Sequence, residues 1–226
     1  MNKMIHAIWL GEKLTPLAHV CIDDWKKQGY TFKLWTEKDP EIIEWIESCE
    51  FTRECYQRKL YAFVSDYLRL KVLQHSGGLY LDTDVTIQKN PFELFSGYKF
   101  VAGYESEGVL GTAVIYAEKD STILESVISF YEKKIIQSNL YMGPGVLNYL
   151  SVKCDFSKME KCAMYDVNYF YNYKNEAIEF IKPNEAYLTH WFQYSWKKNK
   201  GLNYLKSKHL GLLGRIYVWQ KGFFRF

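Results

Sequence analysis

Residues 59–86 read KLYAFVSDYLRLKVLQHSGGLYLDTDVT, and this stretch decides the fold because it joins a helical pattern, a short apolar strand and two carboxylates. Apolar side chains recur at spacings of three and four over residues 60–73, which predicts an amphipathic helix. The run Leu79–Leu81 predicts a buried parallel strand that ends just before Asp82 and Asp84. Ligands of open α/β sheets bind beyond the carboxyl ends of such strands, so the stretch predicts an α/β fold with a binding site at this point.

Asp82 and Asp84 are candidate metal ligands. Two hard oxygen ligands held one residue apart suit Mn²⁺ or Mg²⁺, which keep other coordination positions for water and for substrate phosphates. A metal bridged to a diphosphate is therefore the candidate ligand of this site. For the tripeptide taken alone, a solvated turn is the better interpretation, and the preceding helix is what favours a binding site.

Asp66 and Arg69 lie three residues apart and share one face of that helix. On their own they are best explained as a surface ion pair, which stabilises a helix by roughly 0.2–0.5 kcal/mol. On a helix that leads directly to a pair of carboxylates, the same two side chains can converge on one ligand. Arg69 would then bind oxygen atoms through its forked donors and Asp66 would accept from hydroxyl groups, which is the mixture that sugar recognition requires.

These residues resemble a known family. Ser65-Asp66-Tyr67-Leu68-Arg69, followed by Gly77-Gly78-Leu79-Tyr80-Leu81-Asp82-Thr83-Asp84, is similar to the signature of glycosyltransferase family 32, which includes bacterial capsular polysaccharide transferases. The resemblance covers about the first 200 residues in the same order, and its other matches are Ile5–Gly11, Trp25–Lys27, Lys33–Trp35, His190 and Ser195-Trp196. Where many relatives carry an Asn, this chain has Gly111-Thr112-Ala113, so a polar contact to the sugar is expected to be missing or altered.

The resemblance implies a GT-A type α/β fold, with a single Rossmann-like, mostly parallel sheet flanked by helices. It implies a metal-dependent, retaining hexosyltransferase that moves a sugar from a nucleotide-diphospho-sugar, most simply a UDP-sugar, to a glycan or lipid-linked oligosaccharide acceptor. The implied pathway is the synthesis of a bacterial surface polysaccharide such as a capsule, and the expected cofactor is Mn²⁺ or Mg²⁺. Retention is expected to proceed by same-face attack of the acceptor hydroxyl, assisted by a departing phosphate oxygen.

The resemblance also implies roles for individual residues. The implied catalytic residues are Asp66, Arg69, Asp82 and Asp84, and the implied metal ligands are Asp82, Asp84 and His190. The implied donor-binding residues are Trp9, which would stack on the base, Ser195 and Trp196, which would donate to the β-phosphate, and Ser65, Asp66, Arg69, Tyr80 and Asp82 around the sugar and ribose. Without the family, Trp9, His190 and the Ser195-Trp196 pair would all be assigned to packing.

Two other classes of protein share parts of this pattern. The run Leu81–Thr86 also fits the first motif of haloacid dehalogenase-like phosphohydrolases, in which Asp82 would be the nucleophile. That motif normally begins its domain, and no acidic motif follows here to complete its metal site. A calcium-binding loop would use Glu93, the twelfth residue from Asp82, as its last ligand. Ile87 stands where that loop needs Gly and Pro91 interrupts it, so this class is disfavoured.

Length and composition limit the number of domains, the roles of the cysteines and the expected location of the protein. The 226 residues are enough for one substantial core and most simply form a single domain. The five cysteines are odd in number and have no C-x-x-C spacing, so neither a disulfide framework nor a zinc site is indicated. The N-terminus has no signal-peptide pattern and no apolar run is long enough to span a bilayer, so we expect a cytoplasmic protein.

A basic, amphipathic helical tail is predicted over residues 201–226, after a GT-A domain over residues 1–200. The last thirty residues carry eight Lys and Arg and no Asp or Glu, so the net charge of +3 divides into +8 there and −5 in the rest. Apolar side chains fall near one helical face, a pattern typical of helices on the anionic inner face of a cell membrane. A helix that packs on the domain explains the pattern equally well, and both interpretations stay open. Nucleic acid is not an expected partner, because no base-reading motif accompanies the charge.

The rest of the sequence alternates between strand and helix patterns, which predicts a parallel sheet. Met142–Gly145 is expected to form a tight turn, and Ser121 is expected to cap a helix. Helices are expected over residues 17–28, 40–48, 60–75 and 121–136, and strands over residues 4–10, 31–35, 79–81, 100–104 and 109–116.

Overall fold

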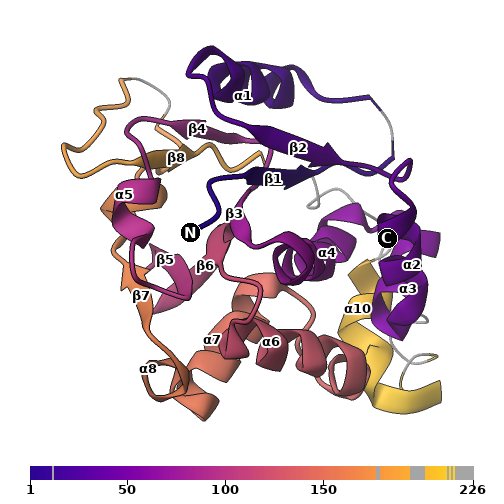
Figure 1. Cartoon of the computed structure of the whole chain (residues 1–226). Helices are drawn as coiled ribbons and strands as arrows, with labels where there is room; N and C mark the ends of the chain where they lie inside the picture. Colours follow the sequence, from indigo (N-terminus) through magenta and orange to yellow (C-terminus); the bar gives the residue numbers. More distant parts are fainter. Residues whose placement is uncertain (12, 177–178, 194–201, 213, 215, 217–226) are drawn as a thin grey trace.

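The computed structural model describes residues 1–11, 13–176, 179–193, 202–212, 214 and 216. They build a six-stranded sheet of order β2-β1-β3-β6-β5-β7 and a two-stranded sheet of β4 and β8 (Figure 1). The strands are β1 (Ile5–Ile8), β2 (Phe32–Trp35), β3 (Gly78–Leu81), β4 (Val85–Ile87), β5 (Phe100–Ser106), β6 (Val109–Ala117), β7 (Cys162–Tyr165) and β8 (Leu188–His190). The helices are α1 (Pro16–Lys27), α2 (Pro40–Ser48), α3 (Glu50–Gln57), α4 (Tyr61–Ser76), α5 (Phe92–Phe95), α6 (Thr122–Lys133), α7 (Gly143–Cys154), α8 (Phe156–Met159), α9 (Val167–Phe170) and α10 (Leu202–Ser207), with 3₁₀ turns η1 (Ile135–Gln137) and η3 (Lys208–Leu210).

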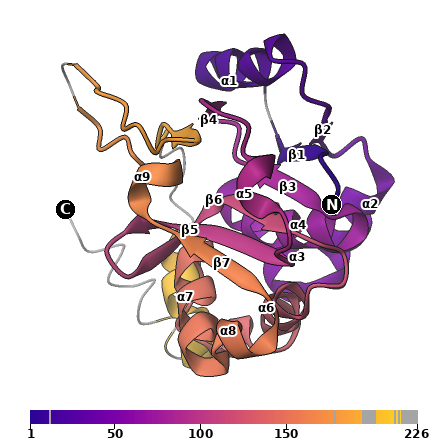
Figure 2. The same ribbon diagram turned by 60° about the vertical axis from the view of Figure 1, so that its left-hand side comes forward.

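Five strands of the large sheet run in the same direction. β1 pairs in parallel with β2 and β3, β7 pairs in parallel with β5, and β6 is antiparallel to both of its neighbours, β3 and β5. One core cluster joins the sheet to α2, α3, α4, α6 and α7, and a second joins it to α1, α5 and α9 (Figures 1 and 2). The predicted α/β class, with a mostly parallel sheet flanked by helices, is therefore confirmed.

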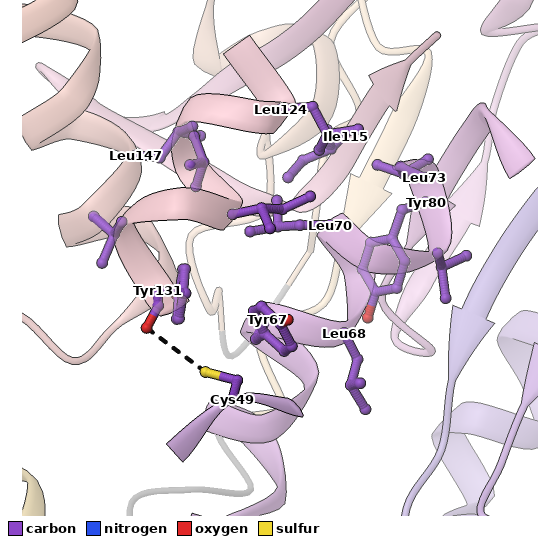
Figure 3. Packing of buried hydrophobic residues seen from close by; sticks show 14 of the residues in the cluster. Cys49, Tyr67, Leu68, Leu70, Leu73, Tyr80, Ile115, Leu124, Tyr131 and Leu147 are labelled. Atoms are coloured by element: carbon purple, nitrogen blue, oxygen red, sulfur yellow. Dashed lines mark hydrogen bonds between the residues drawn. The ribbon is translucent and has the colours of Figure 1, made fainter. Parts of the chain in front are cut away.

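Helix α4 lies at the centre of the larger core cluster. Its Leu70 packs among Ile115 of β6, Leu124 of α6 and Leu147 of α7 (Figure 3). Burying a Leu side chain in this way stabilises the fold by roughly 1.5–3 kcal/mol. The helix ends at Gly77, whose φ of +63° suits a residue without a Cβ. The buried helix therefore leads the chain straight into β3, as the sequence predicts.

Strand β3 begins at a close approach between two backbones. Gly78 has a φ of +114°, and a Cβ at this position would lie 2.6 Å from the carbonyl oxygen of the residue before β1. Glycine therefore allows β3 to pair with β1. Side chains alternate along the strand, so Tyr80 joins the core on the α4 side while its two neighbours join the other core cluster. The strand ends at Leu81, and the N–H of the next residue, Asp82, donates to the carbonyl of Ala113 on β6 (2.8 Å).

Most predicted elements are found within a few residues of their expected ends. Ser121 caps α6, as expected, by accepting from a backbone N–H three residues on (3.1 Å). The helix expected over residues 121–136 ends three residues early. The prediction for Met142–Gly145 is wrong, because this segment begins α7 with Pro144 in the first turn. Proline fits there because the first N–H groups of a helix have no partner within the helix.

The described part of the C-terminal tail packs on the domain. Leu205 of α10 is fully buried in the larger core cluster. Lys208 is also buried, and its ammonium group donates to the carbonyl oxygens of Ile135 and Ser138. Further along, three apolar side chains are exposed, Leu210, Leu212 and Ile216. Residues 213, 215 and 217–226 lie outside the described residues, so both interpretations of the tail stay open. No helix in the described ranges is long and apolar enough to cross a bilayer.

Candidate active site

A cavity of about 550 Å³ lies where β1 and β3 end. Its size is within the range of about 300–1,000 Å³ that is usual for ligand pockets. Of the ten residues predicted for the site, Ser195 and Trp196 lie outside the described residues. The other eight line this cavity, and they are Trp9, Ser65, Asp66, Arg69, Tyr80, Asp82, Asp84 and His190.

Asp82, Asp84 and His190 form a cluster whose possible ligand atoms all lie within 4.8 Å of one another. The small sheet brings them together, because Val85 of β4 pairs with His190 of β8. The His190 Nε2 atom then lies 3.2 Å from Asp84 Oδ1. A residue from late in the chain is thus placed beside the Asp-x-Asp that follows β3.

Asp84 and His190 stabilise each other's charged forms. Burial alone would raise the pKa of Asp84, but His190 and the N–H of Gln193, 2.8 Å from Oδ2, lower it below its usual range. Burial alone would lower the pKa of His190, but Asp84 and then Asp82 raise it above its usual range. The cluster therefore attracts positive charge, which the protonated imidazole supplies and which a divalent cation can supply in its place.

The donor set of this cluster fits a divalent cation. Two carboxylates and an imidazole suit Mn²⁺ better than Mg²⁺, because Mg²⁺ is held almost entirely by oxygen ligands. The second ring nitrogen of His190, Nδ1, is buried without a hydrogen-bond partner within the described ranges. Because a buried polar atom normally has a partner, Nδ1 is open to a ligand or an ordered water.

Arg69 is buried and lies between the carboxylates of Asp66 and Asp82. Its Nη2 atom lies 3.1 Å from Asp66 Oδ1 and 3.4 Å from Asp82 Oδ1. Its Nε atom donates to the carbonyl of Ser65 (3.0 Å), and its Nη1 atom donates to the carbonyl of Thr112 (2.5 Å). The donors of the guanidinium are thus largely used within the protein, so Arg69 fixes the two carboxylates relative to each other in addition to any contact with a ligand.

Tyr80, Ser65 and Trp9 complete the predicted set. The Tyr80 hydroxyl donates to Asp82 Oδ1 (2.7 Å), and the Arg69 guanidinium lies 4.7 Å from the centre of the Tyr80 ring. The Ser65 hydroxyl accepts from Arg69 Nη2 (3.2 Å). Trp9 is half-buried in the cavity wall just after β1, and its stacking on a nucleotide base stays a prediction.

Asp66 is largely buried and lies across the Arg69 guanidinium from Asp82. Burial raises the pKa of its carboxyl to about 6, although Arg69 acts in the opposite direction. The N–H of Gly143 donates to Asp66 Oδ2 (2.8 Å), and the Thr112 hydroxyl also donates to this carboxylate. A Cβ at Gly143 would lie 2.6 Å from Asp66 Oδ1, so only glycine lets α7 approach this closely. Thr112, in the segment where the family resemblance led us to expect an altered polar contact to the sugar, makes a polar contact to Asp66.

Sequence reasoning missed three residues of the site. Gly143 and Gln193 act through backbone N–H groups, which residue type does not reveal. Glu105 lines the cavity from the end of β5, where no motif marks it. The one available signal was Gly143-Pro144, because Pro is common in the first turn of a helix and a neighbouring Gly indicates a close approach.

The calcium-binding alternative does not fit the structure. Its loop would run from Asp82 to Glu93, but residues 85–87 form β4 and pair with β8. Glu93 lies in α5 and is not among the residues that line the cavity. The two acidic ends of the proposed loop therefore do not enclose one cation.

Comparison with known proteins points to one class of enzyme. Residues 18–101 match a family described as the glycosyltransferase sugar-binding region containing a DXD motif. The chain is 26% identical over 165 residues to Subversion of eukaryotic traffic protein A of Legionella pneumophila subsp. pneumophila, a match that covers 60% of this chain and 26% of that protein. The match thus spans about a quarter of the length of that relative.

Two solved structures resemble this fold. A glycosyltransferase involved in the glycosylation of the major capsid of PBCV-1 aligns with a TM-score of 0.52 and 15% identity, over 84% of this chain and 94% of that chain. The PaToxG glycosyltransferase aligns with a TM-score of 0.48 and 19% identity, over 70% of this chain and 71% of that chain. The first likeness shows a GT-A type fold, and the matched sugar-binding region supports a glycosyltransferase.

Proposed function

We propose that this protein is a metal-dependent, retaining glycosyltransferase that uses a nucleotide-diphospho-sugar, most simply a UDP-sugar. The observation that carries the proposal is that the cluster of Asp82, Asp84 and His190 lines the same cavity as Asp66 and Arg69. The cluster suits a cation and a diphosphate, and Asp66 with Arg69 suits sugar hydroxyl groups. A nucleotide sugar needs both groups of residues within one pocket.

The residues of the site would share the work of transfer. The cation would neutralise the nucleoside diphosphate that leaves when the anomeric bond breaks. Asp84 and His190 would hold it, and Asp82 is oriented for the same purpose by Tyr80. Asp66 would accept hydrogen bonds from the sugar and so fix the anomeric carbon in position. Retention of configuration by same-face attack of the acceptor is the mechanism that the family resemblance implies.

Three finer parts of the proposal rest on the sequence alone. Family 32 membership, a role in surface or capsular polysaccharide synthesis, and docking of the basic tail on the inner face of a membrane follow from the resemblance and from the charge pattern. The buried contacts of Leu205 and Lys208 favour a tail that packs on the domain. The exposed Leu212 favours a tail that also meets another surface.

A donor screen tests the function directly. The protein is incubated with a panel of nucleotide sugars, with Mn²⁺ or with excess chelator, and the release of nucleoside diphosphate is measured. We expect release from one or a few donors in Mn²⁺ only. Asp84→Asn should reduce it by roughly 100-fold or more without loss of the fold, because a direct metal ligand is removed.

The matched control is Asp23→Asn, which changes an exposed carboxylate in a surface ion pair and should leave release unchanged. Full activity of Asp84→Asn, or full activity in excess chelator, would contradict the proposal. Release of inorganic phosphate from an added phosphate monoester, such as a sugar phosphate, through an aspartyl-phosphate at Asp82 would instead support the haloacid dehalogenase-like alternative.

A further inference from the structure

A second hollow of about 500 Å³ adjoins the cavity that contains the metal cluster. The end of β5, α9 and the residues after α9 line it, and Figure 2 shows α9 beside β5. α9 lies this close because Gly103 leaves room for the ring of Phe170, where a Cβ would come within 2.5 Å. Glu105 and Phe192 line both hollows, so the two spaces share a wall.

The side chains around the second hollow suit a ring that carries many hydroxyl groups. Tyr171, Tyr173 and Phe192 provide aromatic surface against which the C–H faces of a sugar can pack. Asn168 and Asn175 provide amide groups that both donate to and accept from hydroxyl groups. The combination of aromatic surface with a few polar groups binds and orients a polar ring.

Phe192, a residue of the shared wall, has a strained backbone conformation. Its φ is +50°, which is uncommon for a bulky side chain and persists only where the surroundings fix it. The centre of its ring lies 4.2 Å from that of His190 and 6.2 Å from that of Tyr171. The wall is therefore in contact with the metal cluster on one side and with the second hollow on the other.

Glu105 places a carboxylate in the same wall. It is partly buried and has no hydrogen-bond or ion-pair partner within the described ranges, unlike Asp66, Asp82 and Asp84 in the same cavity. Burial raises the pKa of its carboxyl to about 7. A carboxylate that has no protein donor and that lines both hollows can accept from a hydroxyl of a ligand.

We propose that the second hollow is the acceptor subsite, that its ligand is a carbohydrate, and that Glu105 accepts a hydrogen bond from the hydroxyl that receives the sugar. The inference rests on the proposed function. In the transfer, the hydroxyl oxygen forms a bond to the anomeric carbon of the donor, the bond from that carbon to the diphosphate oxygen breaks, and the hydroxyl proton passes to the departing diphosphate. Glu105 orients the hydroxyl before this step.

Binding to the subsite is tested first, without donor. The probes are the methyl glycosides of glucose, galactose, mannose and N-acetylglucosamine, observed by saturation-transfer NMR with the full-length protein. We expect at least one glycoside to bind the wild-type protein. The saturation-transfer signal of that glycoside should fall in the Asn168→Ala variant, because the exposed Asn168 amide has no hydrogen-bond partner within the described ranges and is available to a ligand. Loss of one hydrogen bond should weaken binding by roughly fivefold.

Transfer is tested next, as the extra release of nucleoside diphosphate when the bound probe is added to the best donor. Glu105→Gln should lower the kcat of transfer by roughly tenfold, with a much smaller change in the KM of the donor, because the hydroxyl loses its strongest acceptor. The matched control is Glu125→Gln, which neutralises an exposed carboxylate of α6 that lines neither hollow and should leave all constants unchanged.

Several outcomes would overturn the inference. Binding of no methyl glycoside to wild type, or equal binding to wild type and Asn168→Ala, contradicts a carbohydrate subsite in this hollow. Stimulation by hydroxyl-bearing peptides and not by glycosides would assign the acceptor to another class. Losses of hydrolysis and transfer in equal proportion in Glu105→Gln would indicate a purely structural role. A wild type that binds glycosides but cleaves no nucleotide sugar would instead contradict the proposed function.

Discussion

The contact between Gly143 and Asp66 can be tested with two alanine substitutions in the first turn of α7. A Cβ at Gly143 would lie 2.6 Å from Asp66 Oδ1 and 2.9 Å from the hydroxyl oxygen of Thr112, so one of these groups must move. A Cβ at Gly145 would meet only Leu140, at 3.7 Å, which is an ordinary van der Waals contact. Neither glycine has a positive φ, so backbone strain does not separate the two variants.

The two alanines should change stability in opposite directions. At Gly143, overpacking costs about 1–3 kcal/mol, and loss of the 2.8 Å hydrogen bond to the buried carboxylate costs a further 1.5–3 kcal/mol or so. Replacing a helical glycine gains at most about 1 kcal/mol. We therefore expect Gly143→Ala to lower the free energy of unfolding by about 1.5–5 kcal/mol, which is a fall in Tm of roughly 3–20 °C. Gly145→Ala gains helix propensity and loses no contact, so it should raise Tm by up to about 4 °C.

The same pair of variants separates the proposed sugar contact at Asp66 from the proposed metal site at Asp82, Asp84 and His190. Gly143→Ala displaces Asp66, so donor turnover below the Tm should fall by roughly tenfold or more, which is about 1.4 kcal/mol of lost transition-state stabilisation. Binding of nucleoside diphosphate with Mn²⁺, measured by calorimetry, should change by less than about threefold, because no metal ligand is touched. If Gly143→Ala keeps the Tm and turnover of Gly145→Ala, this account of how Asp66 is positioned is refuted.

Three further predictions each depend on one buried side chain. Burial lowers the pKa of the His6 imidazole to about 4, below the value of 6.5 in an unfolded chain. Between these two pH values the unfolded state binds one more proton than the folded state. Urea unfolding should therefore show the free energy of unfolding falling by up to about 1.4 kcal/mol per pH unit as the pH is lowered from 6.5 to 4. A His6→Gln variant should lose this slope, and a slope that persists would assign it to other groups. Lys208→Ala should lower Tm by roughly 4–12 °C, because the carbonyl groups of Ile135 and Ser138 lose their donor. Lys206→Ala, at an exposed position, should leave Tm unchanged. Equal effects of the two variants would contradict the buried contact of Lys208. Arg69→Lys should reduce donor turnover by roughly tenfold or more while nucleoside diphosphate still binds, because an ammonium cannot reach both carboxylates. Equal losses of turnover and binding would mark Arg69 as purely structural.

Sequence patterns predicted the structure correctly where a feature depends on a single helix or strand. The helix predicted over residues 40–48 matches α2, because proline marks its start and the buried Ile42 and Ile46 keep the helical spacing. Asp82 and Asp84 follow β3 and line the cavity, as predicted, because a buried apolar strand fixes where the next residues enter a site at its end. Such features depend on neighbours in the chain, and the sequence contains those neighbours.

Contacts between distant segments could not be predicted in this way. His190 meets Asp84 because β4 pairs with β8, and each of these strands has only three residues, too few to show an alternating pattern. The family resemblance, and not the pattern, assigned His190 to the metal site. Gly143 reaches Asp66 through a main-chain N–H, and Glu105 reaches the cavity from the end of a strand. Neither contact leaves a mark on the local sequence.

Arg69 explains why Asp66 and the cluster of Asp82, Asp84 and His190 should respond to each other. One guanidinium nitrogen faces Asp66 at 3.1 Å and Asp82 at 3.4 Å, so the two carboxylates compete for the same positive charge. A divalent cation at Asp82 would satisfy that carboxylate and repel the guanidinium, which would then interact more strongly with Asp66. Because the backbone of Ser65 and Thr112 also holds the guanidinium, this shift can only be small. Metal binding would therefore adjust the position of Asp66, the residue proposed to fix the anomeric carbon, and couple the presence of the cation to the alignment of the sugar.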